Sequence, residues 1–294
     1  MEPSVSDERL RALSRLFSGI GLARVMELED RLDPQLEFAS DVARRWGTGP
    51  GALCSLLTAL VSYRLAMRGE EWWRCFRDFF ADHECPGDPR GAADAVGDFL
   101  KSCRGAAVAR GVKLRRLERA LAARPVLERL LASPREVLLA DHRGLLAAVA
   151  SALGQRPDDK TVVFSLKMAY YACRGTSCPG ASLPMDVPIP VDVRISCASY
   201  SSGLVDVPAG SDPVRTVMAH PEVARRAWTD VALGSGIPPL HLDTVLWAIG
   251  WAPRDLGIED ARSRIYESLE PVIGDRLASA ASDELARRPC RVVR

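Results

Sequence analysis

Apolar side chains recur along the chain with the spacing of amphipathic helices. In the first predicted helix, Leu13 and Leu16 share one face, and residues 6–8 (Ser-Asp-Glu) form a capping start with acid in the first turn. We expect Gly19 and Gly21 to end this helix. The same period continues downstream and predicts a mainly helical protein.

Further helices are expected at about residues 33–46, 51–67, 70–82, 92–101, 113–121, 126–132, 142–153, 160–173, 192–200, 212–218, 221–233, 240–250 and 260–288, with one more short helix from Pro134. Strand patterns are nearly absent, and the segment 205–207 is too short to found a sheet. We therefore predict an all-α fold. It should form a single unit over residues 1–294 with two lobes: lobe A at about residues 30–105 plus the C-terminal helices, and lobe B at about residues 110–205.

Two of the predicted helices, 142–153 and 160–173, are separated only by the short hairpin Gly154-Gln-Arg-Pro-Asp-Asp159. A long irregular loop rich in Gly, Ser and Pro follows at residues 174–191. Its prolines at 184, 188 and 190 favour an extended backbone toward the next helix. The hairpin therefore sets the position of residue 160 at the start of its helix, and the loop sets the position of residue 192.

Composition narrows the class of protein. The 294 residues are 47% hydrophobic and 26% charged, which is close to the globular average. No uninterrupted apolar run of about 18 residues predicts a membrane span, and the first residues lack the pattern of an export signal, so we expect a cytoplasmic protein. With 39 Lys and Arg against 38 Asp and Glu, the net charge of +1 neither favours nor excludes a nucleic-acid partner.

The eight cysteines are expected to be reduced, buried apolar side chains, since no export signal is seen. Cys173 and Cys178 are five residues apart, a spacing that fits neither a zinc site nor an iron–sulfur cluster. His83, Cys85 and Cys103 are the weak candidates for metal ligands. We predict no metal and no cofactor.

Lys160 is the most informative position in the sequence. It opens a helix behind Asp158 and Asp159, and it is one of only four lysines in the chain. A helix N-terminus disfavours an ammonium ion, so in dry surroundings this amine would become a nucleophile. The alternative is an exposed lysine paired with one of the two aspartates.

Phe164 and Lys167 follow Lys160 at i+4 and i+7, so the three side chains share one helix face. An aromatic ring between two lysines is suited to line a pocket. The alternative is a core phenylalanine flanked by two lysines whose stems cover apolar surface.

Asp192 follows an extended Pro-rich segment and begins a helix, where an N-cap role is expected. Helix amides would keep this carboxylate ionised and fixed, a suitable state for an anion that faces a developing cation.

Asp243 and Trp247 form another i, i+4 pair, and the alternative for Trp247 is a core role, which is the usual one for a buried tryptophan. Trp72 and Trp73 are adjacent, so we expect one to be buried and the other to be available. The basic segment 110–124 is either a solvated face or a surface for phosphate backbone.

Three sequence segments resemble those of a known family: Lys160-Thr-Val-Val-Phe-Ser-Leu-Lys-Met, Val187-Pro-Ile-Pro-Val-Asp-Val-Arg-Ile and Leu242-Asp-Thr-Val-Leu-Trp. In order and spacing they resemble the archaeal 8-oxoguanine DNA glycosylase family, a divergent branch of the helix-hairpin-helix glycosylases. The similarity extends to residues 62–73 and to Asp33-Pro-Gln35, so it covers about residues 30 to 250.

The resemblance implies a helix-hairpin-helix fold with an active-site cleft between two lobes. In that family pattern Lys160 is the Schiff-base nucleophile and Asp192 its electrostatic partner, while Phe164 and Trp247 sandwich the extruded base. The implied pocket residues are Gln35, Ser62, Trp73, Lys167, Pro190 (through its carbonyl) and Asp243. The hairpin, with Gly154 and Arg156, would hold a DNA phosphate. It lacks the Pro-Gly-Val-Gly form of the wider superfamily.

The implied function is excision of 8-oxoguanine by base flipping, attack of the lysine on the sugar, and β-elimination. The expected partner is double-stranded DNA carrying 8-oxoguanine, with single strands as a further candidate substrate, and the expected enzyme is a DNA-associated monomer. Two alternatives stay open. One is a related glycosylase for another damaged base, and the other is a non-enzymatic DNA-binding protein in which Lys160 and Asp192 are cap residues.

Overall fold

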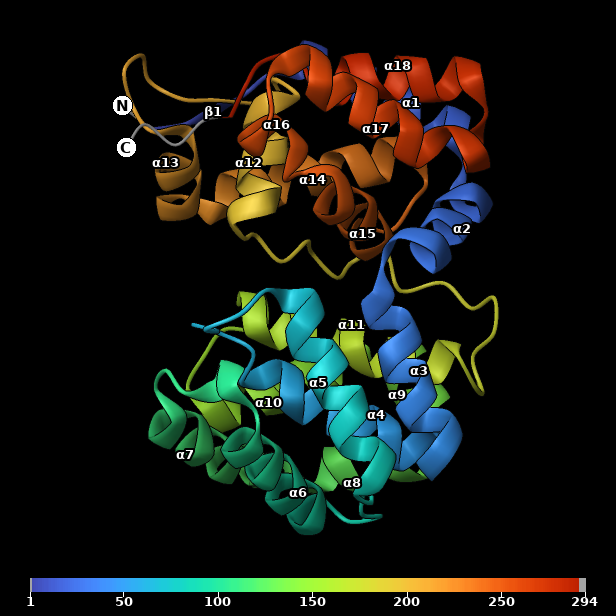
Figure 1. Cartoon of the computed structure of the whole chain (residues 1–294), viewed down its shortest axis with the longest axis vertical. Coiled ribbons are helices and arrows are strands. Elements are labelled where there is room, and N and C mark those ends of the chain that lie inside the picture. The colour runs from blue at the N-terminus through green and yellow to red at the C-terminus, as the bar shows by residue number, and fades with distance from the viewer. Residues whose placement is uncertain (1, 291–294) are drawn as a thin grey trace. The chain divides into compact units, whose positions relative to one another are not determined.

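A computed structural model of the chain describes residues 2–290, which are helical over most of their length (Figure 1). The prediction of an all-α fold is confirmed. Within the described range, no helix has the length and apolar character needed to cross a membrane.

The chain divides into two compact units. Unit 1 combines the residues up to Asp33 with those from Met185 onward, and unit 2 is the continuous stretch Pro34–Pro184. This differs from the expected lobes, which placed residues 30–105 with the C-terminal helices and residues 110–205 apart from both. The expected boundary was wrong because the helix from Lys160 packs against the helices of residues 34–60 and belongs to the same core.

The elements of unit 2 are α3 (Pro34–Trp46), α4 (Thr48–Leu60), α5 (Gly69–Asp82), α6 (Pro89–Ser102), η1 (Arg104–Ala106), α7 (Arg110–Ala120), η2 (Leu121–Ala123), α8 (Arg124–Ala132), α9 (Pro134–Leu139), α10 (His142–Leu153) and α11 (Lys160–Arg174). Helix α11 contacts α3, α4, α9 and α10, and is buried along most of its length. Close approach of α3 and α4 depends on Gly51, where an added Cβ would lie 2.5 Å from Ala43 Cα.

The elements of unit 1 are β1 (Ser4–Val5), α1 (Asp7–Ile20), α2 (Leu22–Leu32), α12 (Val193–Ser201), β2 (Val205–Asp206), α13 (Pro213–Ala219), α14 (Pro221–Ser235), α15 (Pro239–Ile249), α16 (Ala252–Asp255), α17 (Ile258–Ile273) and α18 (Asp275–Leu285). Most of their apolar faces form one core, and a second, small cluster contains Cys197, Val214 and Cys290. The segment near Val205, expected to found no sheet, makes only a two-residue antiparallel pairing with β1.

A buried polar cluster fixes α15 against α2 in unit 1. The Thr244 hydroxyl donates to Glu29 Oε1 at 2.8 Å, and His241 Nδ1 lies 2.9 Å from Glu29 Oε2. All three residues are fully buried. Such hydrogen bonds offset the cost of burying their polar atoms and hold a helix in one orientation. This cluster therefore orients the helix that carries Asp243 and Trp247.

Several predicted helix bounds require correction. The helix expected at 51–67 ends at Leu60, and the one expected at 260–288 is two helices separated by Gly274, which has a φ of 79°. Helix α2 was not predicted. Gly19 lies inside α1, and the helix ends at Gly21, whose backbone leaves the helical conformation with a φ of 80° that glycine adopts readily.

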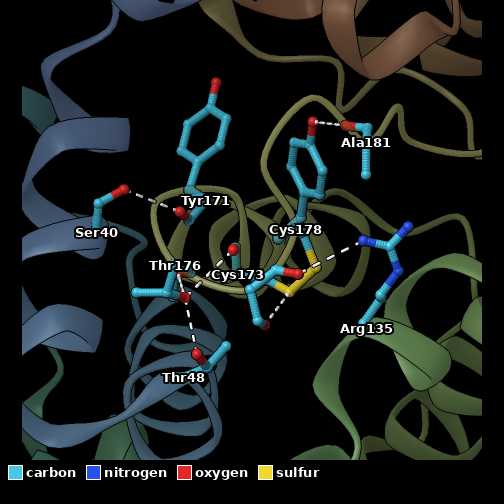
Figure 2. The surroundings of a disulfide bond; sticks show 11 residues. Ser40, Thr48, Arg135, Tyr171, Cys173, Thr176, Cys178 and Ala181 are labelled. Carbon is cyan, nitrogen blue, oxygen red and sulfur yellow. Dashed lines mark hydrogen bonds between the residues drawn. A yellow bond between two sulfur atoms is a disulfide. The ribbon is translucent and has the colours of Figure 1, made fainter.

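The expectation that all cysteines are reduced is wrong for one pair. Cys173 and Cys178 form a disulfide, with their Cα atoms 5.1 Å apart (Figure 2). Helix α11 ends at Arg174, and the chain turns back so that the Cys178 amide donates to the Cys173 carbonyl at 2.8 Å. The reversal brings the two sulfurs together. The same region is tied to α3, where Ser40 Oγ donates to the Tyr171 carbonyl at 3.0 Å.

Candidate active site

In unit 2 the predicted nucleophile, Lys160, is the first residue of α11 and directly follows the hairpin. Gly154 ends α10 in the left-handed conformation, and the Asp159 carboxylate accepts the Arg156 amide at 3.1 Å. Lys160 is exposed, so the dry surroundings considered from the sequence are not found. The side chain of Lys160 is therefore accessible to solvent.

Helix α7 braces the hairpin through the side chains of two arginines. Arg116 Nη2 donates to the Thr161 hydroxyl at 2.7 Å and also bonds the side chain of Gln155. Arg119 bonds the Leu153 carbonyl at the end of α10. Burial lowers the pKa of the Arg116 guanidinium. The basic segment is thus not simply a solvated face, since part of it fixes the residues on either side of Lys160.

Phe164 lies one turn after Lys160 and is half-buried. Its ring meets that of Trp73 edge-on, with centroids 6.1 Å apart. Trp72 instead packs against Phe99, at 4.8 Å. The choice of Trp73 as the residue on the Phe164 side is consistent with this arrangement. The expectation that one tryptophan is available was wrong, because both are almost completely buried.

The other predicted pocket residues of unit 2 are less exposed than Lys160. Lys167 is buried, with its Nζ 5.4 Å from the Tyr171 ring centroid, and Gln35 is buried in the first turn of α3. Ser62 lies just beyond the end of α4, where its hydroxyl donates to the Ala59 carbonyl at 2.8 Å. Because Lys167 is buried, the alternative of two lysines covering apolar surface does not describe this helix face.

In unit 1, Asp192 caps the N-terminus of α12, as predicted. Its Oδ1 accepts the backbone amides of Arg194 and Ile195, each at 2.9 Å. Two such bonds satisfy helix donors and stabilise a helix start by about 1 kcal/mol. Pro190, two residues earlier, is buried. The result is a carboxylate whose position is set by the backbone.

Asp243 and Trp247 lie one turn apart on α15, as their spacing predicts. Asp243 is 3% exposed, while Trp247 is half-buried. The guanidinium carbon of Arg194 lies 3.9 Å from the Trp247 ring centroid, and Arg194 Nη1 donates to the Trp247 carbonyl at 3.2 Å. Asp192 and Trp247 are therefore connected through Arg194.

Over the described residues, no group of three or more His, Cys, Asp or Glu side chains gathers where it could hold a metal ion. The weak candidates His83, Cys85 and Cys103 do not form such a group.

Sequence reasoning missed the two arginines that brace these residues, Arg116 and Arg194. Arg116 lies 45 residues before its partner Thr161, and Arg194 lies 53 residues before Trp247. The only local signal was the position of Arg194 in the first turn after Asp192. Contacts over such separations follow from packing and carry no sequence period.

Comparisons with known proteins identify the family. Residues 14–281 match the AGOG family model, described as N-glycosylase/DNA lyase. The chain is 44% identical over 291 residues to an N-glycosylase/DNA lyase of Aeropyrum pernix, covering 99% of each chain. It is 33% identical to one of Pyrobaculum aerophilum, covering 84% of this chain and 88% of that one.

A solved structure agrees with this assignment. The crystal structure of a Pyrobaculum aerophilum 8-oxoguanine DNA glycosylase, Pa-AGOG, complexed with 8-oxoguanosine, has a TM-score of 0.72 and 27% identity, covering 92% of this chain and 98% of that one. The chain belongs to the AGOG family of N-glycosylase/DNA lyases, which are DNA repair enzymes. The resemblance noted in the sequence is thereby confirmed, and the non-enzymatic alternative is excluded.

Proposed function

We propose that this enzyme removes 8-oxoguanine from DNA and then cuts the strand at the resulting site, with Lys160 as nucleophile and Asp192 as the fixed anion. The observation that carries the choice of lesion is the fold shared over 92% of the chain with a glycosylase complexed with 8-oxoguanosine. The local geometry supplies matching chemistry: an accessible amine on α11, and a carboxylate fixed at the start of α12.

Chemistry on a base requires that its nucleotide leave the helical stack, which costs a few kcal/mol. Phe164 and Trp247 are the proposed stacking partners, and each aromatic contact with a base returns about 1–3 kcal/mol. Both rings are half-buried, so each combines a fixed position with an accessible surface. The flipped base would in turn shield the amine of Lys160 from water.

Recognition of the lesion needs a polar atom that distinguishes 8-oxoguanine from guanine. The oxidised base carries a proton on N7, where guanine presents an acceptor. A fixed acceptor such as the Pro190 or Gln35 carbonyl would accept this N–H, and guanine would leave it unpaired. Lys167, Asp243, Ser62 and Trp73 complete the proposed pocket. Gln35, Lys167 and Asp243 are buried, and buried polar groups discriminate strongly because they cannot turn to water instead.

Base release develops positive charge on the sugar, which the Asp192 carboxylate stabilises. The deprotonated amine of Lys160 bonds to C1′ as the bond from C1′ to the base breaks, and the base leaves with a proton. The sugar ring then opens to an imine. Loss of a proton from C2′ expels the 3′ phosphate, which cuts the strand, and water finally releases the lysine.

The hairpin is the proposed contact for the DNA backbone. The amides of Gly154, Gln155, Arg156 and Asp159 already donate to acceptors inside the hairpin and the end of α10. The phosphate contact therefore rests mainly on the Arg156 guanidinium, which is exposed and pairs with Asp158 at 2.6 Å. A phosphate would exchange for this carboxylate at little cost, because exposed ion pairs are weak.

The test is turnover on a set of duplexes that differ in a single base: 8-oxoguanine, guanine, an alkylated purine or uracil. We expect release of 8-oxoguanine, followed by strand cleavage, and no release of guanine. Preferred release of an alkylated or deaminated base would show that the same lysine chemistry serves another lesion. The proposal that 8-oxoguanine is the substrate would then be wrong. Single-stranded versions of the same oligonucleotides measure whether a duplex is required.

A further inference from the structure

The guanidinium of Arg194 covers one face of the Trp247 ring. Its central carbon lies 3.9 Å from the ring centroid, which is the separation of two stacked planar groups. The same guanidinium donates to the Trp247 carbonyl at 3.2 Å. That carbonyl lies in the last turn of α15, where helix carbonyls lack partners within the helix and favour a cation. One side chain therefore contacts both the ring and the backbone of Trp247.

The backbone of Arg194 is held as firmly as its side chain. Its amide donates to Asp192 Oδ1 at 2.9 Å. On the other side, a Cβ added to Gly250 would lie 2.8 Å from the Arg194 carbonyl oxygen, so α15 reaches this point only because residue 250 is glycine. The start of α12 and the end of α15 are thus in direct contact, with Arg194 between Asp192 and Trp247.

We propose that Arg194 is a positioning residue that supports the indole of Trp247 from one face and leaves the opposite face for the flipped base. This inference rests on the proposed function, because it assumes that Trp247 stacks on the base and that Asp192 stabilises the sugar cation. The guanidinium limits the rotation of the indole, so less freedom is lost when the base binds. It also joins the stacking ring to the helix start that carries the carboxylate.

The opposite arrangement has a different consequence. If the guanidinium instead occupied the ring face on which the base stacks, it would have to move away from Trp247 before the base could bind. A substitution that removes the guanidinium would then strengthen binding of the damaged duplex. The additional bond to the Trp247 carbonyl and the anchored backbone favour a side chain that stays in place. The sign of the change in affinity therefore separates the two arrangements.

The experiment measures binding of 8-oxoguanine duplex and of undamaged duplex in a Lys160→Gln background, which prevents turnover. Arg194→Met keeps the length of the side chain and removes its charge and plane, and should weaken lesion binding about tenfold. Arg194→Lys keeps the charge and should weaken it about threefold. The matched control is Arg215→Met, at an arginine whose side chain is 82% exposed on α13 and pairs only weakly with Asp212. It should leave the preference for the lesion unchanged.

A second pair of variants tests whether the effect passes through the tryptophan. In a Trp247→Ala background, Arg194→Met should add almost nothing to the loss, because the group that it supports is gone. Full additivity, tighter binding by Arg194→Met, or binding equal to that of the Lys160→Gln parent would each overturn the inference. These outcomes differ from failure of the proposed function, in which the parent itself binds 8-oxoguanine duplex no better than undamaged duplex. Circular dichroism melting verifies that each variant is folded.

Discussion

The two groups proposed to do the chemistry are held in different ways. Lys160 is exposed at the end of a hairpin, and four methylene groups separate its amine from the backbone. Arg116 braces the backbone beside it. Asp192 has a short side chain whose oxygen accepts two backbone amides. The proposed nucleophile therefore lies on an exposed side chain over a braced backbone, whereas the carboxylate is itself held by backbone amides.

This difference matches the different requirements of the two roles. A nucleophile has to move toward C1′ and then remain attached while the sugar ring opens. An anion that stabilises developing charge is most effective when it needs no reorganisation during the reaction. Burial alone would have selected a different lysine, because Lys113 and Lys167 are buried and Lys160 is not. Exposure to solvent and the position directly after the hairpin favour Lys160 instead.

The largest effect is expected at the fixed carboxylate. Asp192→Asn keeps an acceptor for the helix amides but removes the charge, so base release should slow about 10²- to 10³-fold. Lesion binding should change much less. Single-turnover release and equilibrium binding measure the two quantities.

The matched control for that variant is Asp212→Asn on α13, since Asp212 is also a helix N-cap and accepts the Arg215 amide at 3.0 Å. It should leave the rate of base release unchanged. Equal losses of rate and binding in Asp192→Asn would mean that the carboxylate acts only as a cap.

A smaller effect is expected at the stacking ring. Trp247→Ala should weaken binding to 8-oxoguanine duplex about tenfold to a hundredfold, because it removes one aromatic face from the flipped base. Binding to undamaged duplex should remain close to that of the wild type. A parallel loss for both duplexes, measured by fluorescence anisotropy, would place Trp247 outside the base site.

The hairpin should contribute to DNA affinity mainly through the charge of Arg156. Arg156→Ala should reduce the slope of log affinity against log salt by about 1, and should do so equally for damaged and undamaged duplex. Titrations at several salt concentrations provide this slope. An unchanged slope would show that the ion pair with Asp158 persists when DNA is bound.

The smallest effect concerns a lysine that has no assigned role. Lys113 is fully buried, its Nζ has no hydrogen-bond partner among the described residues, and burial lowers its pKa. The folded chain therefore binds this proton less readily than the unfolded chain, and the penalty is largest below the folded pKa. We expect Lys113→Met to stabilise the fold by about 1 kcal/mol at neutral pH.

The gain from Lys113→Met should shrink as the pH rises toward the ordinary lysine range, where the unfolded chain also loses the proton. Urea unfolding of wild type and variant at several pH values measures it. Repair activity should be unaffected. A loss of activity in the folded variant would indicate that a buried lysine, rather than the exposed one, takes part in the reaction.

The sequence was most informative where the determinants are local. The hairpin before Lys160 follows from the glycine at position 154 and the polar residues after it, and the cap at Asp192 follows from an aspartate between an extended segment and a helix. These features depend on neighbouring residues, so the sequence displays them directly.

The features that could not be predicted depend on distant contacts. The boundary between the units falls at Asp33 and Pro184 because α11 packs on α3 and α4, which no local pattern indicates. The Cys173–Cys178 disulfide depends on a chain reversal after Arg174. The contact of Arg194 with the Trp247 ring joins two helices through residues that lie 53 positions apart in the sequence.

The central claim is that Lys160 forms a covalent bond with the sugar of the damaged nucleotide. Reductive trapping with borohydride on an 8-oxoguanine duplex tests it most directly, because an imine becomes a stable crosslink. Wild type is compared with Lys160→Gln, Lys113→Met and Lys101→Gln, where Lys101 is an exposed lysine paired to Asp98. The account predicts a crosslink in every protein except Lys160→Gln. A crosslink that persists in Lys160→Gln, or that is lost only in folded Lys113→Met, would contradict it.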